Sequence, residues 1–377
     1  MKLTCTRDNL HQGLSIVSHL TSKNVNLPIL QNVLVKAEGG TIKFTTTNLE
    51  IAVSCVIRGK VDEAGEVTIP SKLFYDYVSL IPNDTVVIDA DRESIKVICG
   101  NHKTKMNGLI ASEFPLVPQV QGNRSYKIPA EDLRTALSQV VFAVSTNESR
   151  PELTGVLMQF KAGTGEGRLT LAATDSYRLA ERTVPVITVI EKDDSMIVPS
   201  RSLLEVSRIL SVFRDDVECP PSIEMTISDS QIVFSYGPVE LTSRIIEGNY
   251  PDYHQIIPSE FKTNAMIDRD DLIRSVKTAS LFSKNNLFDV AFEFDPTTKQ
   301  LSLKATDAAR GENTTLCGAD ISGQANLVTL NYRYLLDGLN SMSSEHVLFR
   351  MIDTANPCVI TPSGSENHLY LVMPIRQ

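Results

Sequence analysis

One type of segment occurs three times in the chain, and this repetition constrains the fold more than any other feature. The segments TIKFTTTN, RLTLAATD and QLSLKATD begin at Thr41, Arg168 and Gln300 and align without gaps. Apolar residues alternate along each segment, which is typical of a half-buried strand. The copies lie about 130 residues apart, a period far longer than that of solenoid repeats. The chain is therefore expected to contain three similar domains.

Helical patterns flank the repeated strands. Before each strand, apolar residues at i, i+4 and i+7 predict an amphipathic helix. These stripes are Leu10, Leu14 and Val17; Leu133, Leu137 and Val140; and Leu272, Val276 and Ala279. A second helix and further strand-like runs complete each copy. We predict an α+β chain of three helix-strands-helix-strands domains. The predicted domains cover residues 1–124, 125–253 and 254–377.

Signatures of catalysis are absent from the sequence. It contains no GxxxxGK[ST] phosphate loop, no HExxH zinc motif and no GxSxG nucleophile elbow. The glycine-rich run at residues 163–167 precedes a predicted strand rather than a helix, so a hairpin turn explains it better than a phosphate site. Six scattered cysteines and six scattered histidines lack metal-ligand spacing. No cofactor and no metal are expected; the remaining enzymatic alternative uses Asp175 or Asp307 as a base at a domain junction.

The net charge of −9 would ordinarily count against a nucleic-acid partner. The charge is unevenly distributed, because the first predicted domain carries a net charge of +1, the second −7 and the third −3. No apolar run is long enough to span a membrane, and the first residues do not resemble a signal peptide. A cytoplasmic location without a membrane partner is therefore expected.

Five segments carry a resemblance to a known family. They are LPILQNVLV at Leu27, FPLVP at Phe114, ATDSYRLA at Ala173, EGNYPDY at Glu247 and VMPIRQ at Val372. In these segments, and along its whole length, the chain resembles the bacterial DNA sliding clamps, the beta subunits of DNA polymerase III. The resemblance implies a head-to-tail homodimer whose six domains form a ring around duplex DNA, with helices lining the hole and sheets outside. It also implies a protein that catalyses nothing and is opened by a separate clamp loader.

A protein that slides on DNA must contact phosphates rather than bases, and lysine and arginine provide such contacts. The resemblance, together with the predicted helices, indicates a set of basic residues that would face DNA. These candidates are Lys23, Lys72, Arg134, Arg150, Arg201, Arg208, Arg274, Lys277 and Arg333. The first predicted helix, residues 8–20, contributes no lysine or arginine to this set. For each candidate, a solvated helix face is the alternative.

The family binds short linear peptides from replicative and other polymerases, the clamp loader and repair proteins, in a groove between its second and third domains. Carried over to this chain, the residues of the groove are Leu153, Thr174, Ser176, Tyr177, Arg178, Leu179, Pro251, Gln255, Ile256, Leu371, Met373, Pro374, Ile375 and Arg376. Apolar walls would hold hydrophobic anchors of the peptide, and Thr174, Arg178 and Arg376 would orient it with hydrogen bonds. The alternative is that Leu371 and Met373 are only the core of a terminal strand.

Three groove positions depart from the family pattern. Ser176 and Tyr177 occupy positions where the family often has Gly-His, and Gln255 occupies a position where arginine is common. The peptide preference of this chain is therefore expected to differ from that of its relatives.

Dimerisation is expected to use free strand edges of the first and third domains. Residues on or near the expected segments are Lys72, Phe74, Ile81, Arg269 and Leu272. A scaffold that binds peptides without forming a ring remains an open alternative.

Overall fold

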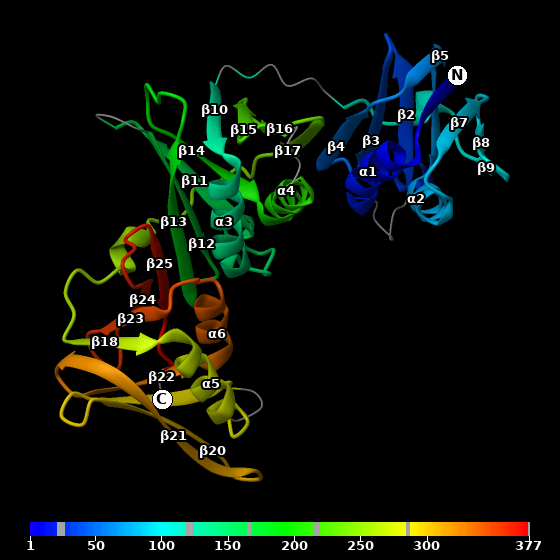
Figure 1. Cartoon of the computed structure of the whole chain (residues 1–377). Coiled ribbons are helices and arrows are strands. Elements are labelled where there is room, and N and C mark those ends of the chain that lie inside the picture. The colour runs from blue at the N-terminus through cyan, green and yellow to red at the C-terminus, as the bar shows by residue number, and fades with distance from the viewer. Residues whose placement is uncertain are drawn as a thin grey trace. The chain divides into compact units, whose positions relative to one another are not determined.

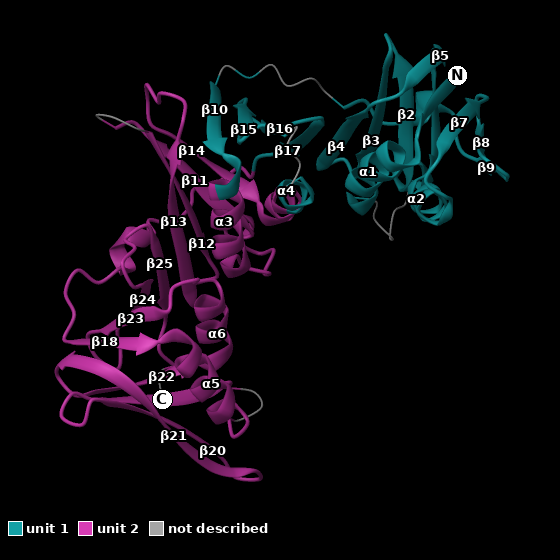
Figure 2. Ribbon diagram, in the orientation of Figure 1, with its two compact units in different colours: residues 1–131, 208–245 teal, residues 132–207, 246–377 magenta. Residues whose placement is uncertain are grey.

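The computed structural model describes residues 1–20, 27–117, 122, 124–163, 167–213, 219–283 and 287–375. It divides the chain into two compact units (Figure 2). Unit 1 contains residues 1–131 and 208–245, and unit 2 contains residues 132–207 and 246–377. Helices α3 (Ala130–Val140) and α4 (Ser200–Val212) each continue from one unit into the other.

Unit 1 contains two antiparallel sheets and helices α1 (Arg7–Val17) and α2 (Ser71–Leu80) (Figure 1). Within the described residues, one sheet has the strand order β5-β1-β7-β8-β9 and the other β10-β15-β16-β17-β4-β3-β2-β6. The strands of the first copy are β1 (Lys2–Thr6), β2 (Asn32–Glu38), β3 (Thr41–Thr47), β4 (Ile51–Ile57), β5 (Lys60–Glu63), β6 (Gly65–Pro70), β7 (Thr85–Ala90), β8 (Ser94–Cys99) and β9 (His102–Asn107). The others in this unit are β10 (Arg124–Pro129), β15 (Ser222–Ile227), β16 (Gln231–Tyr236) and β17 (Val239–Arg244).

Unit 2 contains one long antiparallel sheet and helices α5 (Arg269–Ser280) and α6 (Tyr332–Asn340). Within the described residues its strand order is β14-β11-β12-β13-β25-β24-β23-β18-β21-β20-β19-β22. Its first strands are β11 (Gly155–Lys161), β12 (Gly167–Thr174), β13 (Arg178–Val186) and β14 (Asp194–Pro199). The remaining strands are β18 (Thr263–Asp268), β19 (Asp289–Asp295), β20 (Gln300–Asp307), β21 (Gly311–Gly323), β22 (Asn326–Asn331), β23 (His346–Met351), β24 (Cys358–Pro362) and β25 (His368–Val372).

The three repeated segments form equivalent strands, as predicted from their alternation. They are β3, β12 and β20, and each pairs with the strand before it and the strand after it. Phe44, Leu171 and Leu303 occupy the same position in the three copies and are fully buried. The alternation therefore marks a strand with one face in the core.

The predicted helical stripes also face cores. In α5, Leu272, Val276 and Ala279 are fully buried, and the Asp268 carboxylate caps the helix by accepting a hydrogen bond from the Asp271 N–H. Helices α5 and α6 pack against each other and against strands of the long sheet (Figure 1). Each helix thus covers the sheet of its own copy.

Two strand pairs connect one copy of the repeat to the next, and we call each such pair a joint. In the first joint, β4 pairs with β17, with Cys55 opposite Val239. In the second joint, β13 pairs with β25, with Arg182 opposite His368. Strands of consecutive copies thus share a sheet, so the compact units do not follow the boundaries at residues 124 and 253.

The expected dimer contacts of three apolar residues are wrong. Phe74 and Leu272 are fully buried and Ile81 is 4% exposed, each within the core of its own unit. They have almost no free surface to offer to a second chain. The apolar stripe of a helix has the same sequence pattern whether it covers its own sheet or a partner's, so sequence alone did not separate the two.

Candidate peptide groove and basic surfaces

The candidate peptide groove is built around the turn between β12 and β13. The Asp175 carboxylate accepts hydrogen bonds from the backbone N–H groups of Tyr177 and Arg178 at 2.9 and 3.0 Å. The Thr174 hydroxyl donates to the Arg178 carbonyl at 2.6 Å and accepts from the Ser176 N–H at 3.1 Å. This network holds Ser176 at a φ of 76°. The turn is thereby fixed by short side chains that hydrogen-bond locally.

The same turn chemistry recurs in the other copies. Asn48 accepts hydrogen bonds from the N–H groups of Glu50 and Ile51, and Asp307 accepts from those of Ala309 and Arg310. The acidic or amide residue at the end of each repeated strand therefore closes a turn. This structural role accounts for its threefold presence.

Arg178 is held by its own chain. Its Nε lies 3.0 Å from Asp175 Oδ2, its Nη1 2.5 Å from Asp337 Oδ2, and its Nη2 donates to the Phe142 carbonyl at 2.9 Å. Its guanidinium carbon lies 4.6 Å from the ring centroid of Tyr334. With its side chain only 11% exposed, Arg178 has little freedom to turn toward a peptide.

Tyr177 presents its aromatic ring to solvent. It is 63% exposed, and its ring lies 6.4 Å from that of Tyr334, with 21° between the planes. The Tyr177 carbonyl accepts a hydrogen bond from the Met373 N–H at 2.8 Å. The second joint therefore continues to the edge of the turn and brings Met373 beside Tyr177.

An apolar cluster underlies this part of unit 2. Its buried members are Leu157, Ala172, Leu179, Ile197, Tyr253, Val359 and Leu371, and half-buried Met373 packs against it. Leu179 and Leu371 are fully buried and Leu153 is 2% exposed, so none of the three is an open wall of a groove. The burial of Leu371 agrees with the alternative stated above, that this residue belongs to the core of the terminal strand.

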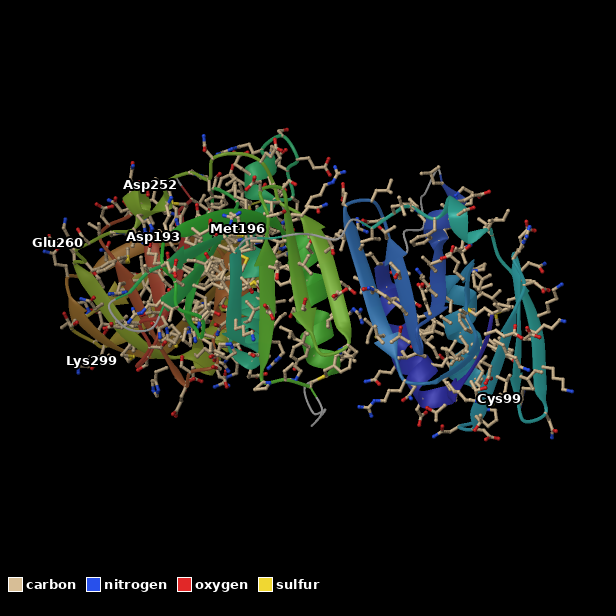
Figure 3. The ribbon with its side chains drawn as sticks, turned by 90° about the horizontal axis from the view of Figure 1, so that it is seen from above. Cys99, Asp193, Met196, Asp252, Glu260 and Lys299 are labelled. Atoms are coloured by element: carbon tan, nitrogen blue, oxygen red, sulfur yellow. The ribbon has the colours of Figure 1, made fainter. Side chains whose placement is uncertain are left out.

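The remaining candidates of the groove are accessible to different degrees. Ile256 is 42% exposed and Gln255 is exposed, whereas Pro251, Pro374 and Ile375 are half-buried. Gln255 donates a hydrogen bond to Asp252, which lies with Glu260 at the outer surface of this unit (Figure 3). Arg376 lies outside the described residues.

Two tyrosines of the EGNYPDY segment support the groove and were missed as site residues. The Tyr250 hydroxyl accepts a hydrogen bond from the Thr174 N–H at 3.1 Å, and the Tyr253 hydroxyl donates to Glu181 at 2.5 Å. Burial raises the pKa of both phenols, so both stay protonated. The sequence did contain a signal for these two tyrosines, because both lie in a segment that carries the family resemblance.

The candidate DNA-contacting residues fall on both units. Those of unit 1 are Lys72 and Arg208, and those of unit 2 are Arg134, Arg150, Arg201, Arg274, Lys277 and Arg333. Lys23 lies outside the described residues. On α5, Arg274 and Lys277 are exposed while Leu272 and Val276 are buried, so the basic residues face away from the core.

The basic candidates differ in how firmly they are engaged. Lys72 and Arg274 form exposed ion pairs with Asp76 and Asp271, and exposed Arg150 pairs with half-buried Glu152. Exposed pairs of this kind contribute little, roughly 0–1 kcal/mol, so phosphate can replace the carboxylate. Arg208 differs, because its Nη2 donates to the Ile16 carbonyl at the end of α1 at 2.6 Å. That position favours a cation and fixes Arg208 within unit 1.

No group of three or more histidine, cysteine or acidic side chains in the described part of the chain is placed to hold a metal ion. None of the helices formed by the described residues combines the length and apolarity needed to cross a bilayer. All six cysteines are free thiols, and each except half-buried Cys219 is buried.

Comparison with known proteins gives consistent matches along the chain. Family models of the DNA polymerase III beta subunit match residues 1–118 (N-terminal domain), 127–252 (central domain) and 254–376 (C-terminal domain). The beta sliding clamp of Synechocystis sp. is 32% identical over 401 aligned residues, covering 100% of this chain and 99% of that protein. The crystal structure of the DNA polymerase sliding clamp from Bacillus subtilis is 26% identical, with a TM-score of 0.92 over 100% of this chain and 99% of that one. A sliding clamp from Bartonella birtlesii is also 26% identical, with a TM-score of 0.93 over 100% of both chains.

Proposed function

The chain belongs to the bacterial beta sliding clamp family, and we propose that two copies of it close head to tail into a ring that encircles duplex DNA. The ring would tether the replicative polymerase to its template and so make synthesis processive. A topological link of this kind needs no base-specific contact, and it permits sliding.

The pattern of joints is the observation that carries this proposal. Each joint pairs the strand that follows the repeated strand of one copy with the last strand of the next copy. In the third copy the strand that follows is β21, and in the first copy the last strand is β9. Within the described residues, residues 311–318 of β21 pair with β20 alone, and β9 pairs with β8 alone. Among these strands, each chain thus has one β21 and one β9 that are not paired in a joint. Two chains can therefore form two more joints, each between β21 of one chain and β9 of the other, and close into a ring.

The exposed basic residues support DNA in the hole. Lys72, Arg201, Lys277 and Arg333 are exposed and lie on helices, whose other faces are buried in the cores. Phosphate contacts of this type are independent of sequence and weaken as salt concentration rises. The net charge of −9 would then discourage nonspecific attachment of DNA to the outer surface.

The groove in unit 2 would bind linear peptides of partner proteins. Exposed Tyr177 lies beside half-buried Met373, which packs on a buried apolar cluster, and half-buried Pro374 follows Met373 in sequence. Exposed Ile256 offers further apolar surface close in sequence to Tyr253, a member of the same cluster. Such a surface suits a short peptide with hydrophobic anchors. We propose that polymerases, repair proteins and a clamp loader share it, and that the clamp works in the cytoplasm without catalysing a reaction.

Retention on DNA of different topology tests this proposal. The protein is loaded onto nicked circular duplex DNA with a clamp loader and ATP, and the mixture is passed through a sizing column. We expect the clamp to travel with the circle and to be lost after a restriction enzyme cuts the circle once. Equal retention on circular and linear DNA would contradict a ring and favour a scaffold that only binds peptides or a nonspecific binder. DNA of the same length that is cut before loading serves as the control.

A further inference from the structure

The two joints inside the chain follow one register, and this register specifies how β9 and β21 would pair between two chains. This inference rests on the proposed ring. We infer that Thr315 lies opposite His102 of the partner chain, Asn313 opposite its Thr104, and Glu312 opposite its Lys105.

The first strand of each joint is aligned through the repeated segments. Phe44, Leu171 and Leu303 are equivalent in sequence, and their cross-strand partners are Cys55, Arg182 and Thr315. Thr315 in β21 therefore occupies the position of Cys55 in β4 and of Arg182 in β13.

The second strand of each joint is aligned through the first helix of each copy. Leu10, Leu133 and Leu272 begin equivalent stripes, and the strands before these helices contain Leu3, Tyr126 and Ala265, seven positions earlier. From Leu3, successive cross-strand partners lead through Ile88 and Val97 to Thr104. The same steps lead from Tyr126 to Leu241 and from Ala265 to Tyr370. Thr104, Leu241 and Tyr370 are therefore equivalent.

The two alignments are independent, and the observed joints agree with both. Val53 lies opposite Leu241, and Ala180 lies opposite Tyr370. The flanking hydrogen bonds also correspond. The Val56 N–H donates to the Pro238 carbonyl and the Thr183 N–H to the Asn367 carbonyl, both at 2.9 Å.

The opposite ends of the joints agree as well. The Arg244 N–H donates to the Glu50 carbonyl at 3.2 Å, and the Met373 N–H donates to the Tyr177 carbonyl at 2.8 Å. We call the inferred pairing of β21 with β9 of the partner chain the third joint. There the equivalent hydrogen bonds would run from the Leu316 N–H to the Asn101 carbonyl of the partner chain and from the Asn107 N–H to the Arg310 carbonyl of the partner chain.

The side chains at this register are complementary in charge. Lys105 and Glu312 are both exposed, and neither has an ion-pair partner within the described residues. The equivalent pairs of the two internal joints are uncharged, namely Ala52 with Thr242 and Leu179 with Leu371. A charged pair at the third joint would favour pairing of β21 with β9 over pairing with β17 or β25.

Engineered disulfides test the register. The hydrogen bonds at Val56 and Thr183 make Val53–Leu241 and Ala180–Tyr370 non-hydrogen-bonded pairs, whose Cα atoms lie about 4.5 Å apart in antiparallel sheets. A chain carrying both Asn313→Cys and Thr104→Cys should therefore form a covalent dimer under mild oxidation. The matched control carries Thr315→Cys and Thr104→Cys, a diagonal pair on the same face about 7–8 Å apart, and should cross-link far less. Each single-cysteine variant controls for the natural thiols.

The outcomes separate the register from the ring. The protein can be a dimer by native mass spectrometry and yet cross-link through positions 315 and 104, or through neither pair of positions. Either result overturns the register and leaves the ring intact. A chain that stays monomeric at micromolar concentration overturns the ring and, with it, the proposed function.

A charge swap gives a second readout. Glu312→Lys or Lys105→Glu should weaken each joint about threefold, and the dimer constant, which contains two such joints, about tenfold. The chain with both substitutions should recover the wild-type constant. Failure of the double variant to recover would contradict the Glu312–Lys105 pair.

Discussion

Arg178 and Asp337 form an ion pair, with 2.5 Å between Nη1 and Oδ2, that connects the first residue of β13 to α6. The same guanidinium contacts Asp175 and the Phe142 carbonyl, so one buried side chain fastens the groove turn to two neighbouring elements. The Arg178 guanidinium is therefore engaged by partners within unit 2 rather than open to a ligand.

A double-mutant cycle measures the coupling free energy of the Arg178–Asp337 ion pair. We expect a coupling of about 1 kcal/mol between Arg178→Ala and Asp337→Ala, because Arg178 is nearly buried while Asp337 is half exposed. The Lys299–Asp320 pair is the control; it is equally well formed at 2.9 Å but exposed at both ends (Figure 3 labels Lys299). Its coupling should fall below about 0.5 kcal/mol in urea unfolding. Equal couplings would contradict a special role for Arg178.

Unfolding free energy should depend on pH through His368. This side chain is fully buried opposite Arg182, and neither ring nitrogen has a hydrogen-bond partner within the described residues. Burial, with a smaller contribution from Arg182, lowers its pKa to about 4 from an unfolded value of 6.5. The unfolded state then binds more protons between these values, so stability falls as pH decreases from 6.5 to 4, by up to about 3 kcal/mol.

The comparison variant is His368→Leu, which removes the titrating group. Its unfolding free energy should lose this part of the pH dependence. An unchanged slope between pH 6.5 and 4 would show that other groups cause it.

Gly338→Ala should destabilise the packing of α6 against β25. Alanine is the better helix former by about 1 kcal/mol, but a Cβ at this position would lie 2.3 Å from the Tyr370 ring. Tyr370 is fully buried and donates a hydrogen bond to the Tyr334 carbonyl, so its ring cannot move aside easily. We expect a net loss of about 1–3 kcal/mol in urea unfolding. Adding Tyr370→Leu should lessen the loss from Gly338→Ala, whereas additive losses would contradict the proposed clash.

Ser176→Gly should relieve backbone strain in the groove turn. A φ of 76° costs a non-glycine residue roughly 1 kcal/mol, and Leu49 has the same φ in the equivalent turn of the first copy. Both Ser176→Gly and Leu49→Gly should therefore be tolerated or slightly stabilising in thermal unfolding. Only Ser176→Gly should change the affinity for a polymerase-derived peptide, as measured by fluorescence titration. Equal effects of both variants on affinity would place the groove elsewhere.

Removal of residues 373–377 should abolish peptide binding and leave the dimer intact. The deletion removes Met373 and the hydrogen bond from the Ile375 N–H to the Thr329 carbonyl, but it keeps Leu371 and the paired residues of β25. Native mass should be that of the wild-type dimer, because β9 and β21 are untouched. Unchanged peptide affinity in the truncated chain would remove the groove assignment.

Local periodicity predicted much of the fold. The alternation of TIKFTTTN and its two counterparts identified β3, β12 and β20, and the stripes beginning at Leu10 and Leu272 identified buried helix faces. Period-2 and period-3.6 patterns report which face is buried, so they suffice for the existence of elements.

Pairing between distant segments could not be predicted in the same way. The joint between Arg182 and His368, and the contact of Arg178 with Asp337 159 residues away, leave no local pattern. For the same reason the sequence named Arg178 as a peptide ligand without revealing its internal partners. Family resemblance supplied the groove positions, but the burial of Leu153 and Leu179 emerged only from the packing.

The in-chain joints have a kinetic consequence for the proposed ring. When the first or second joint opens, a continuous polypeptide keeps its two strands at an effective concentration on the order of millimolar, and the joint recloses. The joints between chains share such a tether only while one of the two remains closed. Dilution therefore acts on the simultaneous loss of both intermolecular joints, whereas DNA can leave through one open joint, so the residence time of the ring on DNA is set by how rarely either intermolecular joint opens.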